Sequence, residues 1–314
     1  MSTLQYTSLD AGITCIDAGY MRPGIACFYL LEQDGEYAVV ETGTSHSFAA
    51  LAQLLAERGI EPAQVRYIIP THVHLDHAGG AGTMMAGLPD AQLLIHPRGA
   101  QHMVDPGRLV DSAMAVYGEQ TFRQLYGEIK PVDPKRIRQL DDGECVELGG
   151  RRLEVRHTRG HANHHFCVWD ELSSGWFSGD MFGVSYPWFR FAQGDFLLPS
   201  TTPTQFEPDA YRASLRLMEG YSPQRMYLTH YGELGYCAEK SALLEQQIDV
   251  YCELAALHRS DAEKLQQSLS DYSVALLQQA AAGAPQSQLR EWLAFDIELN
   301  ALGLQHWQQK IAAA

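Results

Sequence analysis

A cluster of histidine and aspartate residues constrains this 314-residue chain more than any other feature. The run Thr71-His-Val-His-Leu-Asp-His77 follows residues 65–70, whose apolar character is typical of a short buried strand. In an extended loop, side chains two residues apart point the same way, so His72 and His74 can bind one metal ion together. Asp76 and His77 are displaced along the loop and can reach a second ion. Neutral imidazole and carboxylate ligands suit Zn²⁺, and also iron or manganese.

Three later residues complete a candidate ligand set, each at the end of a strand-like segment. They are His161, Asp180 and His230. The seven side chains divide naturally between two ions. The first ion would be held by His72, His74 and His161. The second would be held by Asp76, His77 and His230, with Asp180 as the bridge. Because four such groups fall within six residues, a metal site is favoured over unrelated core or surface histidines.

The rest of the chain reads as an α/β protein. Asp34-Gly35 separates two apolar runs and predicts a hairpin, and residues 48–58 have helical spacing with Ser45 as candidate N-cap and Gly59 as the stop. Further strands are expected at 92–96, 151–157, 165–169, 175–178 and 225–229, and helices at about 108–126 and 209–220. From residue 238 a helical pattern continues, with Gly283-Ala-Pro285 as the one clear break. We therefore expect a catalytic domain over residues 1–237 and a C-terminal helical appendage over 238–314.

Composition limits the classes of partner. Lys and Arg total 23 against 38 Asp and Glu, a net charge of -15, which argues against a nucleic-acid polymer and against anionic membranes. No secretory signal or membrane-spanning stretch is evident, and six scattered cysteines without a C-x-x-C pair are typical of reduced thiols. We expect a cytoplasmic protein, not associated with membranes, whose partner is a small-molecule substrate.

These motifs resemble those of the metallo-β-lactamase superfamily. Residues 71–80 match the H-x-H-x-D-H signature followed by small residues, and Gly160-His161, Ser178-Gly-Asp180 and Thr229-His230 match the later metal elements. The resemblance covers about residues 4–237 and implies an αββα sandwich with the metals at one edge. The Asp76-His77 pair with a bridging Asp180 is similar to the glyoxalase II-like and lactonase-like branches. Several zinc β-lactamases instead have Arg at the position of His77 and Cys at that of Asp180, which counts against β-lactam hydrolysis.

One motif departs from the family pattern. Many relatives read Thr-Pro-Gly-His-Thr-x-Gly-His where this chain reads Thr158-Arg-Gly-His-Ala-Asn-His-His165. Arg159 therefore replaces a proline and His164 a glycine. We interpret His164 as an extra surface or pocket residue.

The resemblance implies a hydrolase with two divalent metal ions, Zn²⁺ being the expected one and iron or manganese the alternatives. Metals lower the pKa of bound water to about 7, so a bridging hydroxide could attack a carbonyl carbon. Asp76 and Asp180 are the predicted catalytic carboxylates. A thioester, lactone or other ester is the expected substrate. The alternatives are a small-molecule phosphodiesterase, a di-iron redox or sensing protein, and a binding protein that has lost turnover.

Residues around the ligands are candidates for substrate binding. Residues 181–204 are rich in aromatics without a clear period, which predicts a long ordered loop. We select Trp188 and Phe189, Arg190 for a carboxylate or phosphate, and Tyr231 for an oxyanion. The alternatives are loop-anchoring aromatics and an exposed arginine or tyrosine. The apolar stripe of the appendage could pack internally or form a homodimer seam; it comprises Leu243, Leu244, Ile248, Tyr251 and Leu254.

Overall fold

The computed structural model describes residues 4–313, and these form two compact units. The first unit comprises the chain up to His157, together with His164–Gly179 and Pro223–Gly235. The second comprises Thr158–Asn163, Asp180–Ser222 and the chain from Tyr236 onward. The boundaries of these two units differ from the domain boundary expected after residue 237. The expected domain division stays a prediction.

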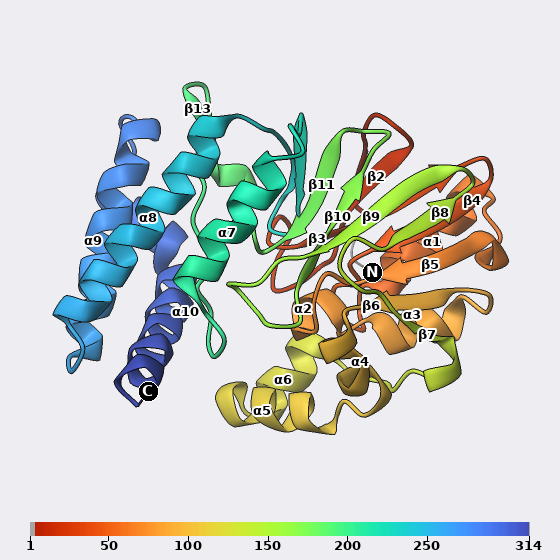
Figure 1. The fold of residues 1–314 in the computed structure, drawn as a ribbon, viewed down its shortest axis with the longest axis horizontal. Helices are drawn as coiled ribbons and strands as arrows, with labels where there is room; N and C mark the ends of the chain where they lie inside the picture. The colour runs from red at the N-terminus through yellow and green to blue at the C-terminus, as the bar shows by residue number, and fades with distance from the viewer. Residues whose placement is uncertain (1–3, 314) are drawn as a thin grey trace. The chain divides into compact units, whose positions relative to one another are not determined.

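A seven-stranded sheet contains the first strands of the chain in sequence order (Figure 1). The strands are β1 (Tyr6–Ser8), β2 (Ile13–Asp17), β3 (Cys27–Gln33), β4 (Glu36–Val40), β5 (Val65–Ile69), β6 (Gln92–Ile95) and β7 (Ile137–Gln139). Neighbours are antiparallel up to β4 and parallel from β4 to β7. Parallel neighbours need long crossover connections, and helices supply them here. They are α1 (Phe48–Arg58), α2 (Leu75–Ala78), α3 (Ala81–Gly87), α4 (Pro97–Val104), α5 (Gly107–Tyr117) and α6 (Glu119–Tyr126).

A six-stranded sheet completes the first unit. Its order is β15-β14-β11-β10-β9-β8, and all neighbours are antiparallel except β11 and β14. The strands are β8 (Cys145–Leu148), β9 (Arg151–His157), β10 (Phe166–Asp170), β11 (Gly175–Gly179), β14 (Arg225–Leu228) and β15 (Gly232–Gly235).

One apolar core joins the two sheets. Side chains alternate between the faces of a strand, so Tyr29 and Leu31 of β3 point to the same side, as do Phe166 and Val168 of β10. All four are buried in one cluster that draws on both sheets. This core leaves the strand ends, rather than the strand faces, available for polar side chains.

The second unit is mainly helical. It contains α7 (Pro208–Glu219), the short hairpin of β12 (Arg190–Phe191) and β13 (Gly194–Asp195), and three C-terminal helices: α8 (Ala238–Leu257), α9 (Ala262–Ala280) and α10 (Gln286–Ala312). The expected helical appendage is thus confirmed. The expectation of a single break was wrong, because α8 and α9 are also separated at residues 258–261. There Asp261 caps α9 by accepting a hydrogen bond from the Lys264 amide at 3.0 Å.

Two other local expectations were wrong. The helix expected over about 108–126 is divided at Gly118, where φ is 76°, into α5 and α6. Ser45 is not the N-cap of α1, which begins after Ser47. The Ser45 hydroxyl instead donates to the Tyr126 carbonyl at 2.6 Å, so a long-range contact takes the place of the local one. Within residues 4–313 no helix is long and apolar enough to cross a membrane.

A buried ion pair fastens β9 to β10 inside the first unit. Arg151 Nε donates to Asp170 Oδ1 at 2.9 Å, and a second guanidinium nitrogen contacts Asp170 Oδ2 at 2.5 Å. Another guanidinium hydrogen bond reaches the Ala11 carbonyl at 2.8 Å. Neither side chain is exposed, so each charge depends on the other for compensation.

Replacing Asp170 with Asn should therefore lower the free energy of unfolding by about 3–5 kcal/mol, because it leaves the Arg151 charge buried and uncompensated. Urea titration followed by circular dichroism measures the change. The control is Glu119→Gln at the exposed Glu119–Arg123 pair, which should cost about 0.5 kcal/mol or less. Equal losses in the two variants would contradict the role given to the buried pair.

His96 makes the stability of the protein depend on pH. It lies directly after β6, where its Nδ1 accepts the Arg98 amide at 3.0 Å, and its ring is 4.0 Å from that of His157. Burial, followed by the charges of His157 and Arg98, lowers the pKa of His96 from 6.5 to about 4. Below pH 6.5 the unfolded chain therefore binds a proton that the folded chain does not.

The contribution of His96 should be complete above pH 6.5 and decrease as the pH falls towards 4, by at most about 1.4 kcal/mol per pH unit. His96→Asn keeps a capping acceptor and removes the titration. The difference in free energy of unfolding between wild type and this variant should narrow between pH 7 and pH 5. His306→Asn, at an exposed position, is the control. A difference that stays constant across this range would refute the effect.

Candidate metal centre

Polar side chains that follow three strands of the first unit lie close together. Glu41 follows β4, the run 71–77 follows its parallel neighbour β5, and Thr229 and His230 follow β14. Because β4 and β5 are parallel neighbours, their carboxyl ends lie at the same edge of the sheet, which brings Glu41 close to the run 71–77. The backbone hydrogen bond from the Cys27 amide to the Thr229 carbonyl, at 2.9 Å, ties the third to the first sheet.

The Glu41 carboxylate organises this group. It accepts the Thr71 amide at 3.1 Å and the Thr71 hydroxyl at 2.6 Å, the Thr229 hydroxyl at 2.9 Å and His77 Nδ1 at 2.9 Å. Glu41 is 1% exposed and has φ of 66°, a left-handed conformation that a non-glycine residue rarely adopts. Four donors therefore compensate one buried negative charge and fix the segments that bear the histidines.

These hydrogen bonds determine which histidine nitrogen is presented. Because His77 Nδ1 donates to Glu41, its Nε2 is the nitrogen left with a lone pair for a metal. His230 Nδ1 donates to the Ile25 carbonyl at 2.8 Å, which likewise leaves Nε2. The Thr71 hydroxyl gives its proton to Glu41, so it accepts from His72 Nδ1 at 3.0 Å. This is the pattern in which an outer partner orients a metal-ligating histidine.

The presented atoms converge within the first unit. The ligand atoms of Asp76, His77 and His230 all lie within 4.8 Å of one another. Asp76 Oδ2 is 3.4 Å from His230 Nε2 and 3.8 Å from His77 Nε2. His72 Nε2 is 2.9 Å from His74 Nδ1, so these two histidines also form a close pair. A carboxylate with several neutral imidazoles is a donor set that fits a divalent metal ion.

The second unit holds the other two candidate ligands together. His161 Nε2 is 3.4 Å from Asp180 Oδ2, and the Ser200 hydroxyl donates to the same carboxylate oxygen at 3.2 Å. The Ser200 carbonyl lies 3.2 Å from His161 Nδ1, so this histidine also presents Nε2. Tyr211 donates to the Asp180 carbonyl at 3.0 Å and fixes the backbone there. That all seven residues share one dinuclear site stays a prediction.

His164 lies within the histidine cluster of the first unit. It is 7% exposed, its ring is stacked on that of His72 with centroids 6.1 Å apart, and its Nδ1 accepts the Val73 amide at 3.5 Å. Of the two alternatives for His164, the surface position was wrong, because this histidine packs against the candidate ligand loop, and the pocket position stays a prediction.

The candidate substrate residues have varied surroundings. Within the second unit, Phe189 is fully buried between Tyr186 and Phe196, and Trp188 is partly exposed and stacked on Tyr186 at 4.9 Å. Arg190 Nη1 lies 3.7 Å from Asp195 Oδ1 across the β12–β13 hairpin. In the first unit, Tyr231 packs against the core between the sheets, and burial raises its pKa. Their roles in binding substrate stay predictions.

Sequence reasoning missed three residues of this region. Glu41 ends an apolar strand, and its acidity at that position was the available signal. Tyr20 and Tyr126, whose hydroxyls are 3.0 Å apart, have no local motif, since 106 positions separate them.

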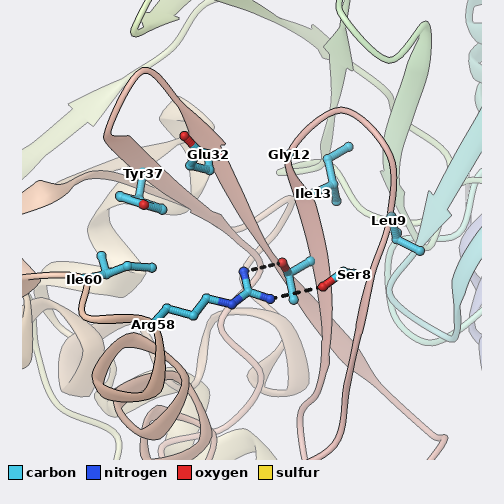
Figure 2. Close-up of a pocket in the computed structure, with 9 residues that line it drawn as sticks. Ser8, Leu9, Gly12, Ile13, Glu32, Tyr37, Arg58 and Ile60 are labelled. Carbon is cyan, nitrogen blue, oxygen red and sulfur yellow. Dashed lines mark hydrogen bonds between the residues drawn. The ribbon is translucent and has the colours of Figure 1, made fainter.

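A separate cavity of about 370 Å³ lies at the other end of the first unit's strands (Figure 2). Arg58 crosses it and donates to the Thr14 hydroxyl at 2.8 Å and the Ser8 hydroxyl at 3.2 Å. Glu32 and Tyr37 also line it. None of its lining residues belongs to the candidate metal ligands.

Comparisons with known proteins agree with this geometry. Among curated proteins, the metallo-beta-lactamase fold-containing protein ST1585 of Sulfurisphaera tokodaii is 26% identical over 226 residues, covering 70% of this chain and 78% of the relative. The human acyl-coenzyme A thioesterase MBLAC2 is 27% identical over 200 residues, covering 58% of this chain and 68% of the relative.

Solved structures show the same fold. ST1585 from Sulfolobus tokodaii, an archaeal metallo-beta-lactamase superfamily protein, matches with TM-score 0.66 and 22% identity over 95% of this chain and 99% of its own. TTHA1429, a metallo-beta-lactamase family protein from Thermus thermophilus, matches with TM-score 0.63 and 20% identity over 99% of this chain and 94% of its own.

The expected metallo-β-lactamase fold with a C-terminal helical appendage is confirmed. The structure has two mixed sheets followed by C-terminal helices. The family model of the metallo-beta-lactamase superfamily matches residues 22–230, which is more than half of the chain. Together with the histidine and aspartate donors at the strand ends, this match means that the chain belongs to the metallo-beta-lactamase superfamily.

Proposed function

We propose that the protein is a metal-dependent hydrolase of a small-molecule thioester, lactone or other ester. The observation that supports this most directly is the convergence of Asp76, His77 and His230, whose ligand atoms lie within 4.8 Å of one another. The similarity to a human acyl-coenzyme A thioesterase is consistent with a thioester, although the chain shares only 27% identity with it.

We further propose that the seven side chains predicted from the motifs hold two divalent metal ions, and that Zn²⁺ is the preferred metal. The support is the order and spacing of those motifs, together with the nitrogen that each histidine presents. His72, His77, His161 and His230 all have Nδ1 turned to a protein acceptor. When bound, such ions supply hydroxide at neutral pH and polarise a carbonyl group.

The protein's own groups have separate tasks in this proposal. Glu41 holds His77 and the strand ends in position and does not meet the substrate. Asp76 is 22% exposed, so it can accept a proton from the attacking water while the buried groups cannot. The net charge of -15 favours a small substrate over a polyanion.

The test is to purify the protein without chelator, measure its metals by mass spectrometry, and assay thioesters, lactones, phosphodiesters and β-lactams. Two metal ions per chain with turnover of a carbonyl ester are expected. Turnover of phosphodiesters alone would replace the proposal with a phosphodiesterase. Near-stoichiometric iron without hydrolysis would indicate a redox or sensing role.

Replacing Asp180 with Ala should remove most of the bound metal and most of the activity, since this carboxylate is the predicted bridge between the ions. Metal content per chain, measured after gel filtration, is the readout. Asp195→Ala is the control, because Asp195 pairs with Lys240 at 2.9 Å in the same unit and is no predicted ligand. Full retention of two metals in the Asp180 variant would contradict the bridging role.

Replacing Glu41 with Gln should weaken metal binding about 10–100-fold, because the outer partner of His77 loses its charge. The amide also brings a donor towards groups that are themselves donors, which should cost about 1–3 kcal/mol of stability. Competition with a chromogenic chelator measures the affinity, and thermal unfolding measures the stability. Glu32→Gln, at an exposed position on β3, is the control. An unchanged metal affinity would show that Glu41 serves folding alone.

A further inference from the structure

Two tyrosines distant in sequence form a buried hydroxyl pair in the first unit. Tyr20 follows β2 and Tyr126 ends α6, and their hydroxyl oxygens are 3.0 Å apart. The rings are 5.7 Å apart at an interplanar angle of 31°, and the residues are 4% and 5% exposed. Nothing in the proposed metal chemistry uses them so far.

The loop that bears Tyr20 is held by hydrogen bonds on both sides. The Asp17 carboxylate accepts the Gly19 amide at 2.8 Å and the Gly24 amide at 2.7 Å, which closes the loop around Tyr20. The Ser47 hydroxyl donates to the Ala18 carbonyl at 2.7 Å. Tyr20 is therefore positioned by its backbone and does not depend on the contact with Tyr126 alone.

Tyr126 is fixed from another direction, by the segment after β4. Its carbonyl accepts both the Ser45 hydroxyl at 2.6 Å and the Ser45 amide at 3.2 Å. A Cβ at Gly127, where φ is 69°, would lie 2.2 Å from Ser45 Oγ, so only glycine allows this approach.

The same segments reach the metal-ligand loop. Thr42 donates twice to the His77 carbonyl, at 2.7 Å each, and the Gly80 amide donates to the Gly43 carbonyl at 3.0 Å. Just beyond Tyr126, the Lys130 carbonyl passes so close to α3 that a Cβ at Gly82 would lie 2.1 Å from it. These contacts place the segment after β4 against α2, and the segment that follows α6 against α3. The helix α2 contains Asp76.

One of the two hydroxyl protons of this pair is not used in the bond between the phenols. Each phenol carries one proton, and the bond between them uses one of the two. Among residues 4–313, neither hydroxyl makes another hydrogen bond. Burial, with the charge of Asp76 among the other causes, raises the pKa of both phenols, so both stay protonated at neutral pH.

We propose that the Tyr20–Tyr126 hydroxyl pair donates a hydrogen bond to the carbonyl oxygen of the substrate and to the negative charge that develops on it. This rests on the proposed hydrolase function and deepens it. The hydroxide adds to the carbonyl carbon, the electron pair of the carbonyl bond moves to its oxygen, and the phenol stabilises that oxygen without giving up its proton. A donor aimed at developing charge favours the transition state over the ground state.

The test uses Tyr20→Phe and Tyr126→Phe in the full-length, metal-loaded protein, with the best ester from the substrate panel. The variant of the tyrosine that holds the second proton should lower kcat about 100–1,000-fold with little change in KM, as removing one such donor does elsewhere. The other variant loses only the bond between the phenols, so its kcat should fall less. Metal content should stay at the wild-type value. Tyr251→Phe is the matched control: it removes a buried hydroxyl bonded to Ser273 at 2.9 Å in the other unit and should leave kcat unchanged.

A second readout is independent of turnover. Octylphosphonate presents a tetrahedral, negatively charged oxygen group, and its affinity for the metal-loaded protein can be measured by calorimetry. The variant of the tyrosine that holds the second proton should weaken this affinity about tenfold or more, because it loses a hydrogen bond to a charged group. The other variant should weaken it less, because it loses only the bond between the phenols.

The outcomes separate this inference from the function on which it rests. If wild-type protein binds metals and hydrolyses no carbonyl ester, the proposed function fails, and the phosphonate measurement alone decides on the donor pair. If both variants keep kcat within twofold and bind octylphosphonate as wild type does, the pair only joins two segments and the inference is overturned. Loss of metal from either variant would also overturn it, since the tyrosines would then support the ligands.

Discussion

The region at the strand ends depends on one buried negative charge. Burying the Glu41 carboxylate without hydrogen-bond partners would cost several kcal/mol of folding free energy. Its four donors are therefore required for the fold at this edge of the sheet. Those donors come from the segments after β5 and β14, and one of them is His77 itself. Compensating the charge therefore also sets the orientation of an imidazole. Folding and ligand geometry follow from the same hydrogen bonds.

Local signals account for the parts of the molecule that could be predicted. The run Thr71-His-Val-His-Leu-Asp-His77 is contiguous, so its position after a buried strand and its chemistry are both legible in the sequence. The C-terminal helices follow from a periodic pattern, although the break at residues 258–261 has no glycine or proline and is marked only by a polar run that ends in the capping Asp261. Ser45 was misassigned because capping is a local expectation, whereas its hydroxyl is used by Tyr126 across the fold.

Long-range contacts account for what was missed. The hydroxyl pair of Tyr20 and Tyr126 forms only where two distant segments of the chain meet. Neither segment has a sequence motif that predicts this contact. His164 was visible as a departure from the family pattern, but its burial against His72 could only come from the folded chain. A sequence thus reveals candidate ligands that lie in one contiguous run more readily than the residues that orient them from other segments.

The short segment after β4 links these groups physically. Thr42 bonds to the carbonyl of His77, Ser45 bonds to the carbonyl of Tyr126, and Ser47 bonds to the carbonyl of Ala18 beside Tyr20. One candidate ligand, His77, and both tyrosines are therefore held by one stretch of backbone that begins at Glu41. Catalytic groups need to be placed to within about 0.5 Å, and a shared support reduces their relative movement. The same arrangement means that a shift in residues 42–47 would displace the ligand and the hydroxyl pair together.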